Sequence, residues 1–184
     1  GYYTRVGIAD IYLPSAYGYI YGYLPGITAI QGLRLAVKAQ HQQGSASRRE
    51  NSITMTPRGF DDSGSEYFIR NVSDSHLLLS ADYVIPVWVG DISWFSPLFY
   101  IKNFEVTPHL DYGFYKSRIG SENFSLFSAG ADITAHLANF LWIPYDCRIG
   151  FTFDMNGGKS FDKMKSGGYV SDNHHFGFIF SISL

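Results

Sequence analysis

The sequence predicts an all-β protein, an antiparallel up-and-down transmembrane β-barrel. Three observations predict this class: strict alternation of apolar and polar residues, long alternating segments, and aromatic residues at the segment ends. Successive side chains of a strand point to opposite faces, so alternation gives each strand one apolar face. Most segments have about 10–13 residues, whereas globular strands average about 5–6 and tilted membrane strands need about 9–11.

Alternation predicts the strands in chain order. Residues 4–13 give a weak candidate. Residues 16–24, with a tyrosine at every second position, give a further candidate, which would raise the number of strands from seven to eight and is called the eighth candidate. Six stronger segments follow, at residues 32–42, 76–87, 103–115, 128–137, 146–156 and 176–184. No segment keeps a helical period. We therefore expect about seven or eight strands in a single domain, residues 1–184.

The two faces of each predicted strand differ in chemistry. In residues 146–156, Phe151 and Phe153 oppose Arg148 and Asp154. Charges in mid-strand suit the wet or plugged lumen of a membrane barrel, and aromatic residues at strand ends suit its interface girdles. The end-of-strand aromatic residues are Trp88, Trp94, Phe95, Phe99, Tyr100, Phe140, Trp142 and Tyr145. A soluble sandwich or lipocalin-like barrel also alternates and stays an alternative.

Composition excludes several other classes. Charged residues make up 16% and aromatic residues 17%, which is the reverse of the bias of disordered chains. The net charge of −2 gives no basic field, so no nucleic-acid partner is expected. A single cysteine excludes a disulfide framework and a multi-thiolate metal site.

The longest and most polar connection is residues 44–75. Outer-membrane barrels carry long loops on the extracellular side, and counting strands back from a periplasmic C-terminus places this connection outside. The same count places 116–123 and 157–173 outside, and 88–102 and 139–145 inside. The loop 44–75 holds the tripeptide Arg58-Gly59-Phe60.

The end of the chain alternates up to its last residue. Gly177 is followed by large apolar residues at every second position, and this pattern resembles the outer-membrane β-signal, the closing strand that the insertion machinery recognises. The residues of this strand are Gly177, Phe178, Phe180, Ile182 and Leu184. Leu184 stands where the signal usually has an aromatic residue.

The tripeptide Arg58-Gly59-Phe60 resembles the (V/I)RG(F/Y) motif of the surface-antigen superfamily, which comprises BamA-type assembly factors and two-partner-secretion translocators. Residues 80–86, 100–113 and 128–132 resemble the following strands of that superfamily in the same order, so the resemblance covers residues 32–184. Departures are Thr56-Pro57 before the arginine, Asp82 for glutamate and Leu110 for phenylalanine.

The resemblance implies a place and a task. It implies the bacterial outer membrane of a Gram-negative cell, with membrane lipid, client outer-membrane or secreted proteins, and periplasmic or surface accessory subunits as partners. The task would be insertion, assembly or translocation of other proteins. Superfamily barrels have about 16 strands, so the chain would be the C-terminal part of a longer barrel. Alternatively, eight strands close a small barrel with a structural or surface-binding role.

The charges on the predicted lumen face predict the contacts of Arg58. The predicted lumen face carries five acids and three bases: Asp82, Glu105, Asp111, Asp132 and Asp154 against Arg34, Lys38 and Arg148. An arginine on a loop folded into this wall would find carboxylates, so we predict Asp82 or Asp111 as its partner, with Glu105 as a third candidate. Gly59 would allow a tight turn and Phe60 would wedge against the wall. A solvated arginine beside an ordinary glycine turn is the alternative.

No residues point to catalysis. His109 and Asp111 share one strand face, and polar lining explains them better than a proton relay or half of a metal site. Asp61, Asp62 and Asp74 lack the spacing of a calcium loop. We therefore expect no enzyme activity, no catalytic residues, no metal and no cofactor. A soluble all-β ligand carrier remains a third functional alternative.

Overall fold

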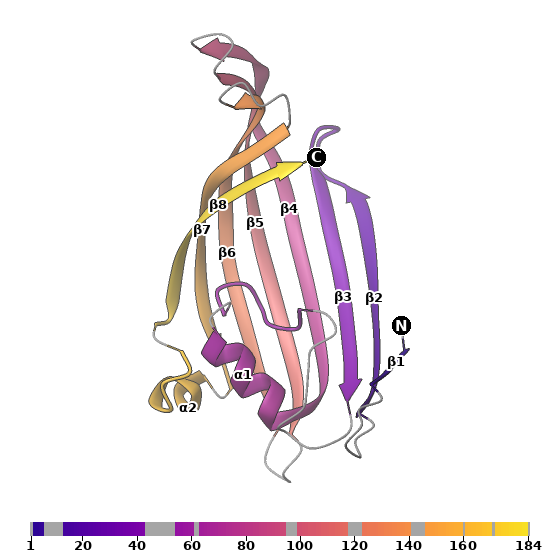
Figure 1. Cartoon of the computed structure of the whole chain (residues 1–184). Coiled ribbons are helices and arrows are strands. Elements are labelled where there is room, and N and C mark those ends of the chain that lie inside the picture. The colour runs from indigo at the N-terminus through magenta and orange to yellow at the C-terminus, as the bar shows by residue number, and fades with distance from the viewer. Residues whose placement is uncertain are drawn as a thin grey trace.

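The computed structural model describes residues 2–5, 13–42, 54–60, 63–94, 99–117, 123–140, 146–159, 161–170 and 172–183. These residues form one antiparallel β-sheet and two short helices (Figure 1). The strands are β1 (Tyr2–Arg5), β2 (Leu13–Pro25), β3 (Gly32–Gln42), β4 (Ser73–Trp94), β5 (Phe99–Ser117), β6 (Phe124–Phe140), β7 (Asp146–Gly158) and β8 (His174–Ser183).

The sheet is an eight-stranded meander in which strands pair in chain order from β1 to β8. Every neighbouring pair is antiparallel. The predicted all-β antiparallel class is confirmed. Among the residues that the structure describes, the sheet does not close on itself, so β1 and β8 are its two edge strands.

The predicted strands match the structure best where alternation is unbroken. Strand β3 has the predicted bounds, and β2 contains the eighth candidate. The expected connection at residues 88–102 is wrong, because β4 continues to Trp94 and β5 begins at Phe99. Register shifts between Pro86 and Trp88 and between Val89 and Ile92 break the alternation there, but the two backbones stay paired.

The structure also contains two short helices, although no segment of the sequence keeps a sustained helical period. Helix α1 (Ser63–Val72) lies within the long loop, and helix α2 (Phe161–Ser166) lies between β7 and β8. In α1, the residues that pack inward are spaced three and four apart: Ser65, Phe68, Ile69 and Val72. This helical period is only two turns long, and it is therefore weak beside the strand signal of the neighbouring residues.

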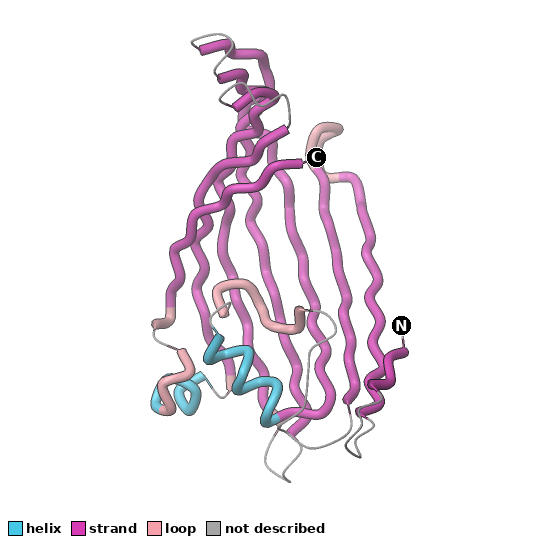
Figure 2. The backbone as a smooth tube through the Cα atoms, in the orientation of Figure 1, coloured by secondary structure: helices cyan, strands magenta, loops and turns pink. Residues whose placement is uncertain are grey.

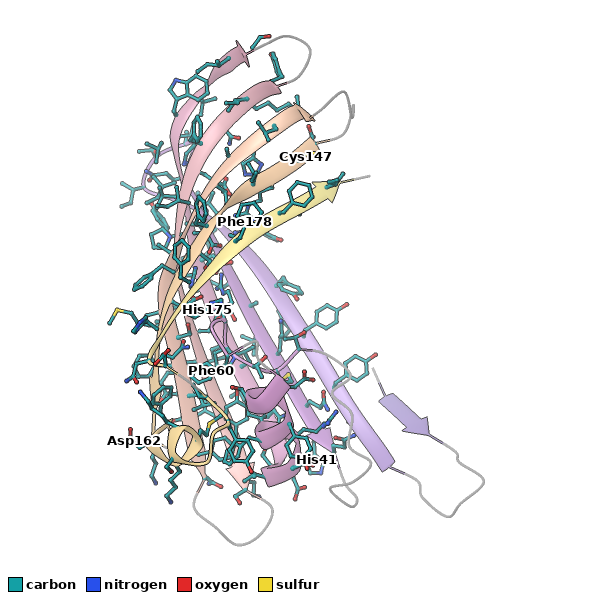
Figure 3. All side chains as sticks on the ribbon, turned by 60° about the vertical axis from the view of Figure 1, so that its left-hand side comes forward. His41, Phe60, Cys147, Asp162, His175 and Phe178 are labelled. Atoms are coloured by element: carbon teal, nitrogen blue, oxygen red, sulfur yellow. The ribbon has the colours of Figure 1, made fainter. Side chains whose placement is uncertain are left out.

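The sheet is curved, and residues 54–60 and α1 lie against its concave side (Figure 2). A compact apolar core forms between the concave side and the two helices. It consists of Phe60, Ile69, Tyr115, Phe124, Leu126, Phe161, Met164 and Val170. Figure 3 shows Phe60 on this side, next to α1. The long loop is therefore anchored to the sheet by apolar packing.

Burial along the strands is the reverse of that in a water-soluble sheet. On the convex side, large apolar side chains are exposed, among them Ile133 at 59% and Phe151 at 51%. On the concave side, polar side chains are buried, among them Thr107 at 0% and Asp154 at 1%. Cys147 shares the face of Phe151 on β7 but is buried, at 2% exposure.

Neither helix in the described part of the chain is long and apolar enough to cross a membrane.

Candidate functional site

Arg58 is held against the concave side by Asp111. The Arg58 Nε and Nη2 atoms each donate a 2.9 Å hydrogen bond to one carboxylate oxygen of Asp111, and the Arg58 backbone N–H donates a third, also of 2.9 Å. Nη2 also donates to Oδ1 of Asp82. Such a two-pronged contact between guanidinium and carboxylate is the strongest ion-pair geometry available to side chains.

The register of β3, β4 and β5 brings these charges together. Asp82 on β4 lies opposite Arg34 on β3 and opposite His109 on β5. Asp111 on β5 lies opposite Ser80 on β4. Asp82 and Asp111 therefore share one face of neighbouring strands. The second oxygen of Asp82 lies 3.6 Å from Nη2 of Arg34, so Asp82 sits between two arginines.

The charge of Arg58 is preserved by its surroundings. Burial opposes the charged form, but hydrogen bonds and charges from Asp111 and then Asp82 outweigh it and raise the pKa of the guanidinium above its ordinary value. Asp111 is only 2% exposed. The pair therefore joins a buried carboxylate to a partly buried guanidinium, whose side chain is 31% exposed.

Glu105, expected as a third partner of Arg58, contacts other residues. Its Oε1 lies 3.1 Å from Nη2 of Arg148 and 3.1 Å from Nε2 of His136. Glu105 and Asp111 share a face of β5 but are six residues apart, which is about 20 Å along a strand. A single side chain on residues 54–60 cannot reach both, so the expectation for Glu105 is wrong.

Gly59 has a backbone that other residues rarely adopt, with a φ of 79°. Its carbonyl accepts a 2.7 Å hydrogen bond from Nδ2 of Asn156 on β7. A Cβ at this position would lie 2.5 Å from the Oδ1 atom of Asn156 and 2.8 Å from the Cβ of Asp154. Gly59 therefore meets two requirements, a left-handed turn and close approach to the sheet.

Phe60 and Met55 complete the attachment of the loop. Phe60 is 1% exposed, and its ring meets the ring of Phe161 edge-on at 6.0 Å. The hydroxyl of Tyr115 donates a 2.7 Å hydrogen bond to the carbonyl of Met55. Residues 54–60 are thus fixed to β4, β5 and β7 by charge, hydrogen bonds and apolar packing. We call them the clamp segment.

Replacing Gly59 by alanine is expected to lower the free energy of unfolding by about 3 kcal/mol or more, because left-handed strain adds to displacement of the Asn156 amide. Gly168 provides a matched control, since its φ is 73° but a Cβ added there would have nothing within 4 Å. Gly168→Ala should cost about 1–2 kcal/mol from strain alone. Urea unfolding of both variants measures the difference, and equal costs would show that the close approach of Gly59 contributes nothing.

A second polar cluster crosses β5, β6, β7 and β8. Nε2 of His109 lies 2.6 Å from Oδ1 of Asp154, and Nδ1 of His175 lies 3.4 Å from Oδ2 of the same residue. Gly130 stands between His109 and Asp154 in the register. Its missing side chain lets them meet, since a Cβ there would lie 2.7 Å from Nε2 of His109. Sequence reasoning placed His109 with Asp111, because the cross-strand register was unknown.

The predicted β-signal residues lie on β8. Phe178, Phe180 and Ile182 are exposed on the convex side, and Gly177 pairs with Thr152 on the concave side. Leu184 is outside the described residues. In the part of the chain that the structure describes, β8 pairs with β7 alone.

Metal binding finds no support in the described residues, where no three His, Cys, Asp or Glu side chains gather in a suitable cluster. Asp61 and Asp62, considered for calcium, lie outside those residues.

No family model, curated protein or solved structure matches the chain.

Proposed function

We propose that the chain is part of an outer-membrane β-barrel of the surface-antigen type, which inserts or translocates other proteins. The observation that carries the proposal is the reversed burial of the sheet. A soluble protein rarely exposes a continuous apolar face, because such a face promotes aggregation. A face of this kind is what membrane strands present to lipid, while their other face is polar.

The clamp segment supports the proposal that the barrel is of the surface-antigen type. Large outer-membrane barrels hold loops or plugs inside a polar lumen. Here the Arg58–Asp111 pair and the packing of Phe60 hold residues 54–60 on the concave side. We infer that this loop enters the lumen from the cell surface, in keeping with the motif that Arg58, Gly59 and Phe60 resemble.

The outer edges of the sheet, which are unpaired in the described part of the chain, provide a mechanism for the insertion of client proteins. In lipid, an unpaired backbone N–H or C=O costs several kcal/mol, so a strand end there must find a partner. We infer that further strands complete the barrel and that β8 forms a weak seam with the first of them. A client β-strand could then pair with the backbone of β8 in place of that strand.

Depletion of the protein in its own host cell tests the task. Loss of an assembly factor should lower the amounts of many outer-membrane proteins at once, and re-expression of the unaltered protein should restore them. If their amounts stay constant, the chain is instead a small barrel with a structural or surface-binding role. If the protein is monomeric without detergent and shows no heat-dependent gel shift, it is neither an assembly factor nor a small membrane barrel. The soluble ligand carrier would then be the remaining alternative.

A further inference from the structure

Strand β2 carries a row of tyrosines on an unexpected face. Tyr17, Tyr19, Tyr21 and Tyr23, which we call the tyrosine ladder, pair across β3 with Gln40, Lys38, Ala36 and Arg34. Directly paired residues of antiparallel strands share a face. Arg34 contacts Asp82, and Asp82 contacts Arg58 of the clamp segment, so this face is the concave one. The tyrosine ladder therefore lies on the polar side of the sheet.

Most of the tyrosine ladder is open to solvent, in contrast to buried concave-side residues such as Thr107 and Asp154. Tyr19, Tyr21 and Tyr23 are each more than half exposed. The rings of Tyr19 and Tyr21 lie 5.4 Å apart, tilted by 59°, and alternate residues of a strand repeat about every 7 Å. The result is a regular line of flat apolar rings, each of which ends in a hydroxyl group.

Two cations with unused hydrogen-bonding capacity lie beside the tyrosine ladder. Nε of Arg34 is buried and has no hydrogen-bond partner, and Lys38 forms no ion pair with any acid that the structure describes. A shallow pocket of about 140 Å³ lies here, lined in part by Tyr21, Tyr23 and Arg34. The nearby charges are three bases, Arg34, Lys38 and Arg58, and two acids, Asp82 and Asp111. The surplus is positive and suits an anion.

The backbone of β2 pairs with β3 from Ser15 to Pro25 and with β1 from Leu13 to Ala16. Backbone N–H and C=O groups of a strand point along the sheet toward neighbouring strands, whereas side chains stand out from its faces. A ligand that lies over the tyrosine ladder is therefore recognised by side chains. An acyl chain would leave the charge of Lys38 without a partner, and burial of unpaired charge is costly.

We propose that the tyrosine ladder, with Arg34 and Lys38, binds a carbohydrate chain that carries carboxylate groups. Sugar rings have apolar C–H faces that stack on aromatic rings, and their hydroxyl groups take hydrogen bonds from the flanking polar side chains. The carboxylates pair with Lys38 and Arg34. This site goes beyond protein insertion and does not depend on it.

Calorimetric titration of the detergent-solubilised protein with an oligogalacturonate tests the site. We expect binding that weakens with added salt and is stronger than binding of neutral maltoheptaose or a polyglutamate peptide. Tyr21→Ala and Lys38→Gln should each weaken it by about two- to tenfold, and Tyr21→Phe should keep most of the affinity.

The control is Ile20→Ala, on the same strand but the convex face, which should leave affinity unchanged. All variants should retain the heat-dependent gel shift of the unaltered protein. Absence of oligogalacturonate binding, or equal binding of maltoheptaose, would overturn the proposal. Stronger binding of polyglutamate would overturn it in favour of a polypeptide site, and an unchanged affinity of Tyr21→Ala would remove the tyrosine ladder from the site.

Discussion

Arg58→Ala is expected to lower the free energy of unfolding by about 3–5 kcal/mol, because it leaves the carboxylate of Asp111 buried without its partner. Asp111 accepts three hydrogen bonds from Arg58, two from the guanidinium and one from the backbone. The substitution keeps only the backbone bond. Urea unfolding of the protein in detergent or lipid, followed by Trp fluorescence, measures the loss.

Two further variants separate the ion pair from a general effect of removing an arginine. Arg70 lies on α1, where its guanidinium sits 5.9 Å from the centre of the exposed Tyr67 ring. Arg70→Ala should change stability by less than about 0.5 kcal/mol. Adding Asp111→Asn to Arg58→Ala should recover part of the loss, because the buried charge is gone. If Arg58→Ala behaves like Arg70→Ala, the ion pair does not hold the clamp segment.

Phe151→Arg is expected to lower the stability of the lipid-inserted protein by about 2–4 kcal/mol, the cost of an arginine facing the middle of a bilayer. Phe151 lies near the middle of β7, and its ring contacts those of Phe176 and Phe178 on β8 at 5.6 and 5.7 Å. Reversible folding into lipid vesicles over a urea series gives the difference.

The matched controls are Phe151→Leu, which keeps the site apolar, and Asp172→Arg, which adds the same cation at an exposed position outside the strands. Phe151→Leu should cost less than about 1.5 kcal/mol, and Asp172→Arg should have little effect. In a water-soluble protein, arginine at the half-exposed position 151 would also have little effect. Equal stability of Phe151→Arg and Asp172→Arg would therefore place Phe151 in water.

Sequence could predict the strands because a two-residue period reports which face each side chain takes. Strand β3 shows this well, since only Ala36 interrupts the alternation of apolar and polar residues from Leu33 to Gln40. The ends of β4 and β5 were missed where register shifts at Trp88 and Val89 break the period. Helix α1 was missed because its inward residues span only two turns.

The partners of Arg58 could be narrowed from charge alone, since Asp82 and Asp111 belong to the predicted polar face. Sequence could not decide which of Asp82, Asp111 and Glu105 contacts Arg58. That depends on where the loop crosses the strands, and Glu105 lies too far along β5 from Asp111 to share the contact. The His109–Asp154 contact depends on a cross-strand register over Gly130, which no single segment of sequence encodes. The alternation within one segment therefore predicts which face of the sheet a side chain takes. Its contact partner on another strand depends on how the whole strands are aligned.

The most direct test of the central claim is the accessibility of nitroxide labels in lipid vesicles. The native Cys147 is first replaced by serine. Single cysteines are then labelled at Leu35, Ile133, Phe151 and Phe180, with Lys159, an exposed residue directly after β7, as a control. Lipid contact predicts that dissolved oxygen relaxes the four convex labels and that a water-soluble nickel chelate does not, while the chelate reaches the label at position 159. Relaxation of the four convex labels by the nickel chelate would show that water, and not lipid, covers this face. Protection of these labels from both reagents would show that another protein surface covers it.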